Sequence, residues 1–196
     1  HYAGMDDGVI FEVLNEPQGK LTNALMEPVN MGVLEIIRRE NPTRWVMLSG
    51  DRWGGFAGLQ DARLPDDPRT IWSFHFYQPF DFTHQGAPWT GLDLPTGVRW
   101  GTQADRAEIS RHAAKAAAYG ARHGKPLFLG EFGAYTEAPA QDRVAWVRHV
   151  REAAEANGIA WCHWDFASAF PIYDRDREEW IAPMKDALLG ESTSPN

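Results

Sequence analysis

The chain alternates short apolar runs with longer stretches in which apolar residues recur every three or four positions. A short uninterrupted run bounded by turn residues is typical of a strand buried on both faces, whereas helical spacing indicates an amphipathic helix. Strands are predicted at residues 9–14, 45–49, 70–74, 126–129 and 159–164, and helices at about 25–40, 103–123, 144–156 and 183–189. Because strand and helix alternate, the pattern predicts an α/β protein with a parallel sheet.

Signals at the ends of these elements support the assignment. Pro28 suits the first turn of the first long helix, and Pro42 follows its end. Gly124 follows the Ala-rich segment 103–123, as expected at a helix C-terminus. Residues 78–102 contain Pro, Gly and aromatic residues without periodicity, and connections of that length are usually functional. We therefore expect a binding loop there.

Composition narrows the function classes. The 196 residues, 43% of them apolar and 23% charged, describe one ordinary globular domain. A net charge of −8 without a basic run argues against a nucleic-acid partner, and no apolar stretch approaches the ~20 residues of a membrane-spanning helix. The single Cys162 cannot form an internal disulfide. Nine Trp residues are many for this length; most serve the core, and others can line a cleft in which ring faces stack on sugars.

Polar and aromatic side chains follow the predicted strands at the point where each strand ends. Glu16 comes after the first strand, His75 and Tyr77 after the third, Glu131 after the fourth, and Trp164 closes the fifth. In (β/α) barrels, active sites lie at this edge of the sheet. Hydrolysis of a glycosidic bond requires two carboxyl groups, one protonated and one ionised. Taken alone, however, either Glu is more often a solvated loop residue.

Four short segments, taken in order, resemble glycoside hydrolase family 5 of clan A. They are Asn15-Glu16-Pro17 after an apolar strand, His75-Phe76-Tyr77 after another, Gly130-Glu131-Phe132-Gly133 after the next, and Trp164 at the end of the last. Segment 83–89, THQGAPW, is also similar to one in bacterial endo-β-1,4-glucanases (cellulases) of this family. The resemblance covers essentially the whole chain and implies a β-glucan polysaccharide or oligosaccharide as substrate.

Members of this family are eight-stranded TIM barrels in which the Asn-Glu-Pro segment belongs to the fourth strand. The resemblance therefore implies a partial (β/α)8 TIM barrel made of five parallel strands, numbers four to eight, with flanking helices. Residues 1–196 would form a single truncated catalytic half-barrel domain that lacks the first three strands. An Arg and a His that the family contributes from earlier strand ends would be missing with those strands.

The resemblance also implies roles for single residues. It makes Glu16 the general acid/base and Glu131 the nucleophile of a retaining double displacement, with the two carboxyl groups ~5–5.5 Å apart. Asn15 would bind the 2-hydroxyl of the sugar in the −1 subsite. His75 would lie beside Glu16, and Tyr77 would donate a hydrogen bond to Glu131. No metal ion and no cofactor is required.

Several Trp residues are candidates for sugar binding. Trp164 would form the floor under the −1 sugar, as the resemblance implies. Trp53, Trp89 and Trp100 lie on strand-end loops and are candidates for further subsites, although a place in the core accounts for each of them equally well. Residues 174–176, DRD, lack the Gly and the distal Glu of a calcium loop, so a solvated turn is expected there.

A five-stranded arc would have two open edges and would leave inward-facing apolar side chains wet. Exposing several hundred Å2 costs on the order of 10 kcal/mol at ~25 cal/mol per Å2, so we expect a homo-oligomer, a dimer in which a second copy covers the arc. Two functions stay open: an endoglucanase that degrades cellulose, slowed by the truncation, or a catalytically weak, self-associating fragment that binds sugar. Mannan and xyloglucan stay open as substrates. Secretion is expected by family analogy, although the sequence shows no signal peptide.

Overall fold

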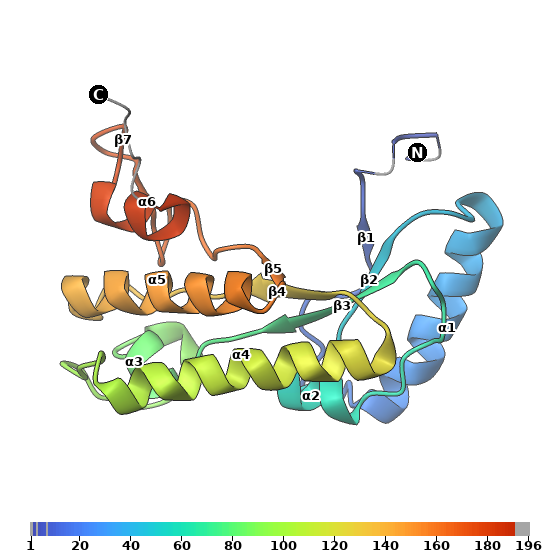
Figure 1. The fold of residues 1–196 in the computed structure, drawn as a ribbon, viewed down its shortest axis with the longest axis horizontal. Helices are drawn as coiled ribbons and strands as arrows, with labels where there is room; N and C mark the ends of the chain where they lie inside the picture. Colours follow the sequence, from blue (N-terminus) through green and yellow to red (C-terminus); the bar gives the residue numbers. More distant parts are fainter. Residues whose placement is uncertain (1, 3, 7, 191–196) are drawn as a thin grey trace. The chain divides into compact units, whose positions relative to one another are not determined.

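A computed structural model describes residues 2, 4–6 and 8–190. Its main sheet has five strands in the order β1-β2-β3-β4-β5, and the β1–β2 and β2–β3 pairs are parallel (Figure 1). These strands are β1 Phe11–Glu12, β2 Val46–Leu48, β3 Thr70–His75, β4 Leu127–Glu131 and β5 Ala160–Trp161. The helices are α1 Asn23–Glu40, α2 Phe56–Asp61, α3 Phe80–Thr83, α4 Gln103–His123, α5 Ala140–Ala156 and α6 Ala182–Leu189. The predicted α/β class, with parallel strands and flanking helices, is confirmed.

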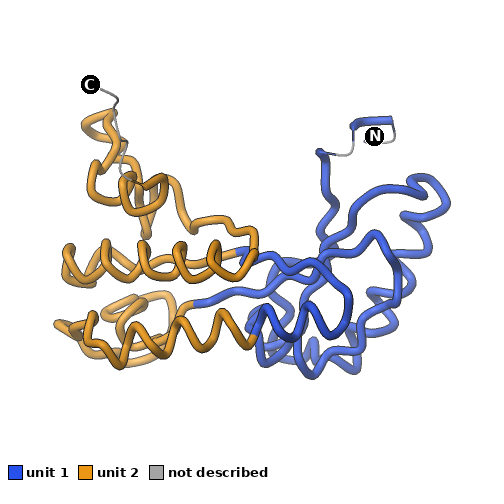
Figure 2. The backbone as a smooth tube through the Cα atoms, viewed as in Figure 1, with its two compact units in different colours: residues 1–76, 116–130 blue, residues 77–115, 131–196 orange. Residues whose placement is uncertain are grey.

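The chain divides into two compact units (Figure 2). Unit 1 comprises His1–Phe76 and Ala116–Gly130, and unit 2 comprises Tyr77–Lys115 and Glu131–Asn196. The boundaries fall within α4 and before the last residue of β4, so both units contain part of these two elements. Among the described residues, every helix is too short or too polar to traverse a bilayer.

The core of unit 1 forms around β2. All three residues of this strand are buried, as expected for a strand that pairs with β1 on one side and β3 on the other. Leu34 of α1 is buried together with Val46 and Leu48 of the strand, and Ile37 packs against them. The apolar stripe of α1 therefore covers one face of this part of the sheet.

Two glycines allow the chain after β2 to turn directly into α2. A Cβ on Gly50 would lie 2.2 Å from the backbone carbonyl carbon of Gly58. A Cβ on Gly58 would lie 2.0 Å from the carbonyl oxygen of Asp51. Neither position has room for a side chain, because the two backbone segments are in direct contact.

Helix α1 begins earlier than predicted, so Pro28 lies inside it and not in its first turn. The backbone N–H of Asn23 donates to Oδ2 of Asp51 at 2.9 Å, and the backbone N–H of Asp51 donates to Oδ1 of Asn23 at 2.8 Å. Asp51 thereby satisfies one of the free donors at the start of the helix and places a negative charge there. This partner is 28 residues away in sequence, which is why local signals misplaced the helix start.

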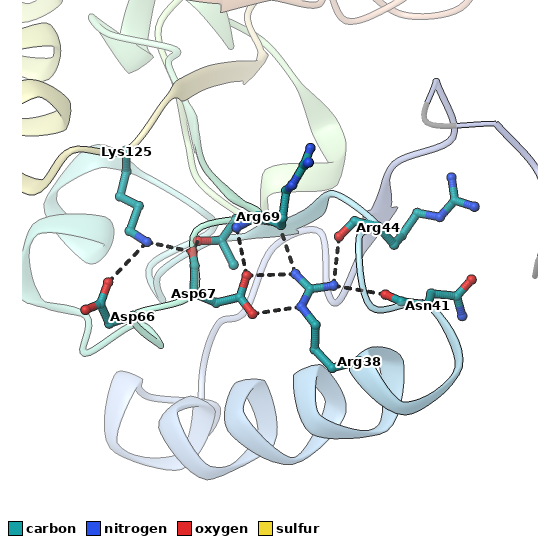
Figure 3. Close-up of polar contacts among 8 residues, drawn as sticks. Arg38, Asn41, Arg44, Asp66, Asp67, Arg69 and Lys125 are labelled. Atoms are coloured by element: carbon teal, nitrogen blue, oxygen red, sulfur yellow. Dashed lines mark hydrogen bonds and ion pairs between the residues drawn. The ribbon is translucent and has the colours of Figure 1, made fainter.

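The C-terminal turn of α1 is fastened by Arg38 (Figure 3). Its Nε and Nη2 donate to the two carboxylate oxygens of Asp67 at 2.7 and 2.8 Å, and its Nη1 donates to the carbonyls of Asn41 and Arg44. The hydrogen bonds from Arg38 lower the pKa of Asp67. Lys125 donates to the backbone carbonyl of Asp67 at 2.7 Å, which ties the segment before β4 to the same place.

The core of unit 2 is largely aromatic. Trp146 of α5 and Phe132, which follows β4, are fully buried with ring centroids 6.3 Å apart. The indole N–H of Trp146 donates to the carbonyl of Gln78 at 3.1 Å. Helix α6 packs against α5 and buries Met184 and Leu188.

The strands are shorter than the apolar runs that predicted them. Strands β1 and β5, at the two ends of the strand order, contain only two residues each. Segment 78–102 contains α3 and a 3-10 helix at Pro88–Thr90, which are too short to show a period. Helix α2 and the antiparallel hairpin of β6 Tyr173–Asp174 with β7 Glu179–Trp180 were also not predicted.

Candidate active site

In unit 1, Glu16 is paired with His75. A hydrogen bond of 2.7 Å joins Oε1 of Glu16 and Nδ1 of His75. The His75 side chain is only 3% exposed, whereas that of Glu16 is 30% exposed, so the carboxyl group remains accessible to a ligand while its partner is enclosed. This pair therefore presents one oriented carboxyl group to solvent.

Two glycines hold the imidazole of His75 in place. A Cβ on Gly130 of β4 would lie 3.0 Å from Nε2 of the ring. A Cβ on Gly54, which has φ +65°, would lie 3.5 Å from Cγ and Nδ1 of the same ring. The backbone N–H of His75 donates to the carbonyl of Gly54 at 2.9 Å. Because main chain approaches the ring from β4 and from the Gly54 loop, its direction toward Glu16 is fixed by packing as well as by hydrogen bonding.

In unit 2, Tyr77 is paired with Glu131. The phenol O–H of Tyr77 donates to Oε2 of Glu131 at 2.8 Å, which fixes the direction of this carboxyl group. The ring of Tyr77 lies edge-on to His84 with centroids 4.9 Å apart and is near Phe170, and Thr83 donates to its carbonyl at 2.6 Å. The hydroxyl is thus aimed by a packed aromatic group. Sequence periodicity gave no signal for that group.

The surroundings of Glu131 also affect Cys162, the residue after β5. Partial burial, and then the negative charge of Glu131, raise the pKa of the Cys162 thiol. Two residues before Glu131 along β4, the side chain of Leu129 is buried in the core. The charge of Glu131, at the end of β4, therefore acts on the thiol of Cys162 at the end of the next strand.

Trp164 and Asn15 are both exposed. The backbone N–H of Trp164 donates to the carbonyl of Phe132 at 3.0 Å. A Cβ on Gly133 would lie 2.0 Å from the carbonyl oxygen of Trp164, so only glycine permits this approach of the two backbones. Asn15 belongs to unit 1, where its carbonyl oxygen would be 3.4 Å from a Cβ on Gly54.

The other Trp candidates differ in exposure. Trp53 is exposed and adopts a left-handed backbone conformation, and its backbone N–H donates to the carbonyl of Pro17. Trp89 is exposed and lies edge-on to Tyr135 with centroids 4.7 Å apart. Trp100, by contrast, is buried against Phe82, so it belongs to the core and not to a subsite.

The structure thus brings the candidate residues together in two hydrogen-bonded pairs, one in each unit. His75 is the last residue of β3, and Tyr77 follows it with one residue between them. Carboxyl groups that follow strands of a parallel sheet, each hydrogen-bonded to a residue at or just beyond the end of β3, are typical of glycoside hydrolases built on a (β/α) barrel scaffold.

Comparison with known proteins agrees with this class. The chain belongs to the Cellulase family, glycosyl hydrolase family 5, whose sequence profile matches residues 1–169.

Three relatives illustrate the match. Endoglucanase H of Acetivibrio thermocellus is 32% identical over an alignment 201 residues long, which covers 100% of this chain and 21% of that protein. A hyperthermophilic endo-β-1,4-glucanase, solved in complex with substrate, is 37% identical with a TM-score of 0.93 over 97% of this chain and 62% of the other. Thermotoga maritima Cel5A in complex with mannotriose is 29% identical with a TM-score of 0.92 over 96% of this chain and 62% of the other. The sheet is therefore part of a TIM barrel and corresponds to its C-terminal strands, which confirms the expected partial barrel.

Proposed function

We propose that this chain is a cellulase-like glycoside hydrolase that cleaves internal β-1,4 linkages of cellulose or related β-glucans with retention of configuration. The observation that carries the proposal is the pairing of two strand-end carboxyl groups with partners of matching chemistry, Glu16 with His75 and Glu131 with Tyr77. Membership of the Cellulase family supports it. The chain covers 21% of Endoglucanase H and 62% of the solved glucanase. We therefore propose for this chain the activity that those longer proteins are named for.

In this mechanism, the ionised carboxylate of Glu131 attacks the anomeric carbon and forms a covalent glycosyl-enzyme. Glu16 donates its proton to the glycosidic oxygen as the bond to the leaving sugar breaks. Water then attacks the anomeric carbon, Glu16 accepts the proton of that water, and Glu131 is released. Tyr77 donates its hydrogen bond to the carboxylate of Glu131 before the attack and again after the release.

The remaining candidates act on the sugar. Asn15 would bind the 2-hydroxyl in the −1 subsite, where a hydrogen bond that strengthens in the transition state lowers the barrier. Trp164 would provide the floor under the same sugar, and the exposed rings of Trp53 and Trp89 would bind neighbouring sugars. The residues that perform the reaction are side chains of this chain, so the proposal includes no cofactor.

The direct test is hydrolysis of carboxymethyl cellulose by the wild type and by Glu131→Gln and Glu16→Gln. Both variants should lose nearly all activity, and Glu35→Gln on the exposed side of α1 is the matched control that should retain it. Proton NMR of the first product should show the β-anomer, as retention requires. Initial formation of the α-anomer would disprove double displacement, and wild-type activity in Glu131→Gln would disprove the role of Glu131.

A mannan is the second candidate substrate, because Thermotoga maritima Cel5A has been solved with mannotriose. Xyloglucan remains a further alternative from the same family. A panel of carboxymethyl cellulose, β-mannan and xyloglucan, each with wild type and Glu16→Gln, ranks the three. Absence of Glu16-dependent turnover on all three would favour the other alternative, a catalytically weak fragment that binds sugar and associates with itself.

We also propose that residues 1–196 act as a single catalytic half-barrel domain and that a second copy covers their exposed apolar surface. On α1 the side chains of Leu25, Val29 and Ile36 are exposed, and so are Ile10 and Leu14 around β1. Light scattering after size exclusion should give twice the 22.1 kDa mass of the chain. Leu25→Lys should weaken the dimer, and a monodisperse monomer of the wild type would contradict the proposal of a dimer.

We also propose that the protein is secreted, because its proposed substrate is an insoluble polymer outside the cell and by analogy with the family.

A further inference from the structure

Helix α5 carries a charged residue on the side that it otherwise buries with apolar side chains. The buried stripe of this helix runs at helical spacing through Arg143, Trp146, Val147, Val150 and Ala154. Arg143 is only 8% exposed. The glycosidase reaction as proposed above gives this residue no role. A charged side chain enclosed to this extent is normally paired with a group of opposite charge.

Within the described part of the chain, Arg143 lacks such a partner. Its buried Nε and Nη1 have no hydrogen-bond acceptor there. The neighbouring Asp142 instead accepts hydrogen bonds from Nε and Nη2 of Arg99 at 2.6 and 3.0 Å, and from the backbone N–H of Trp100 at 3.0 Å. The hydrogen bond with Asp142 raises the pKa of Arg99, whereas burial lowers the pKa of Arg143. Arg143 is therefore a buried cation whose charge is not balanced by a carboxylate of the described residues.

His163 adds buried polar atoms at the same place. Helix α5 packs against β5, and His163 follows that strand after one residue (Figure 1). Both ring nitrogens of His163 are buried, and neither has a hydrogen-bond partner among the described residues. Burial is the main cause that lowers the pKa of His163, and the positive charge of Arg143 lowers it further, so the two side chains are near each other. At pH 7 this imidazole is neutral and has one N–H to donate.

Asp165 is the acidic group that acts on His163, and its carboxylate is engaged within its own loop. Oδ1 accepts from the backbone N–H of Ser168 at 2.7 Å. Oδ2 accepts from the hydroxyl of Ser168 at 2.6 Å and from the backbone N–H of Phe170 at 3.3 Å. The charge of Asp165 raises the pKa of His163, but burial outweighs it. This carboxylate therefore holds the loop and leaves the nitrogens of His163 without a partner.

Aromatic rings pack beside both groups. The ring of His163 stands at 88° to that of Phe132, with centroids 5.5 Å apart. Trp146, which lies about one helical turn after Arg143, has its ring centroid 6.3 Å from that of Phe132. Apolar surroundings of this kind favour a small ion that loses its water readily. One guanidinium beside a neutral imidazole carries a single positive charge, which a monovalent anion balances.

We infer that Arg143 and His163 form a binding site for a small monovalent anion, such as chloride, between α5 and the end of β5. The guanidinium Nε and Nη1 and the imidazole N–H would donate to the ion. The bound anion would neutralise the buried charge and connect the first turn of α5 to the residues that follow β5, so it would stabilise unit 2. The inference goes beyond the proposed function and does not depend on it, because it concerns stability and not hydrolysis.

The test is the melting temperature of the whole chain as sodium chloride replaces sodium methanesulfonate at constant ionic strength. An anion that binds the folded state should raise the melting temperature by about 2–5 °C at about 200 mM chloride, and the increase should saturate. Arg143→Met should lose this dependence. In methanesulfonate it should melt no lower than the wild type, because it removes an unbalanced buried charge. Arg148→Met, at a half-buried position of the same helix, is the matched control and should keep the dependence.

The imidazole of His163 gives a second measurement at the site itself. In methanesulfonate, NMR titration should give a pKa of about 4 for His163, and chloride should raise it, because a nearby negative charge favours the protonated ring. Equal wild-type melting temperatures in the two salts would overturn the inference, and so would a chloride effect that persists in Arg143→Met. If Arg143→Met does not fold, the wild-type pKa of His163 decides, and a value that chloride leaves unchanged would overturn the inference.

Discussion

The substitution Gly130→Ala tests whether packing around His75 sets the direction of Glu16. Gly130 lies in β4 beside the end of β3, and a Cβ at this position would lie 2.8 Å from Oγ of Ser73 and 3.0 Å from Nε2 of His75. Ordinary contacts of a Cβ begin near 3.4 Å, so the imidazole must move by several tenths of an ångström. Its Nδ1 is bonded to Glu16 at 2.7 Å, so this movement lengthens or bends that hydrogen bond.

The magnitude follows from crowding one methyl group into a packed interior. Overpacking of this kind costs about 1–3 kcal/mol, which lowers the melting temperature of a chain of this length by about 2–10 °C. A catalytic group displaced by a fraction of an ångström loses rate, so we expect hydrolysis to fall about tenfold or more. The assays are thermal unfolding, hydrolysis of carboxymethyl cellulose, and the 15N chemical shifts of the His75 imidazole, which report displacement even without turnover.

Two further variants isolate the cause. In α1, a Cβ on Gly32 would have no neighbour within 4 Å, so Gly32→Ala should raise stability by about 0.5–1 kcal/mol and leave the His75 signals in place. Adding Ser73→Gly to Gly130→Ala removes the hydroxyl contact but not the contact with the ring, so only part of the loss should return. Wild-type melting temperature and wild-type His75 shifts in Gly130→Ala would refute the reasoning.

Three other changes give distinct expectations. Tyr77→Phe removes the donor to Glu131 and should lower kcat about 10-fold to 100-fold with the circular dichroism spectrum unchanged; wild-type kcat would show that this hydrogen bond is dispensable. Asp67→Asn should lower the free energy of unfolding by about 1–2 kcal/mol at pH 7, and the difference from wild type should shrink as the pH falls through the lowered pKa of Asp67; urea unfolding at pH 7 and at successively lower pH values measures both. Burial lowers the pKa of His163 from 6.5 to about 4, so wild-type stability should fall by about 3 kcal/mol between pH 6.5 and pH 4 from this group alone, because only the unfolded chain takes up the proton. His163→Gln should remove that part of the pH dependence, and a parallel decline in both proteins would contradict the assignment.

The sequence predicted elements best where local signals and tertiary packing agree. The Ala-rich segment before Gly124 forms α4 over the predicted residues, because its helix propensity and the stop signal that follows it are both local in the sequence. Helix α1 was misplaced at its start, because the partner that satisfies Asn23 is Asp51, in a loop that local periodicity cannot relate to it. The hairpin that carries Tyr173 and Trp180 escaped prediction, since two-residue strands have no measurable period.

The candidate site could be predicted only through the family resemblance. Periodicity placed Glu16 and Glu131 after strands, but it could not tell a catalytic carboxylate from a solvated one. The resemblance also implied the pairs with His75 and Tyr77, and the structure contains both as hydrogen bonds. The exposure of the Trp residues was equally out of reach, because the buried Trp100 and the exposed Trp89 both lie in the same irregular segment. The catalytic roles themselves stay predictions until the variants are measured.

The reciprocal bonds between Asn23 and Asp51 have a consequence for how unit 1 opens. Each backbone amide is held by the side chain of the other residue, so separating the two segments frees both amides at once, and we expect the start of α1 and the loop after β2 to exchange their hydrogens at similar rates. The first turn of α1 would then not fray on its own. It would instead belong to the same cooperative unit as the strand β2 that lies 23 residues further along the chain.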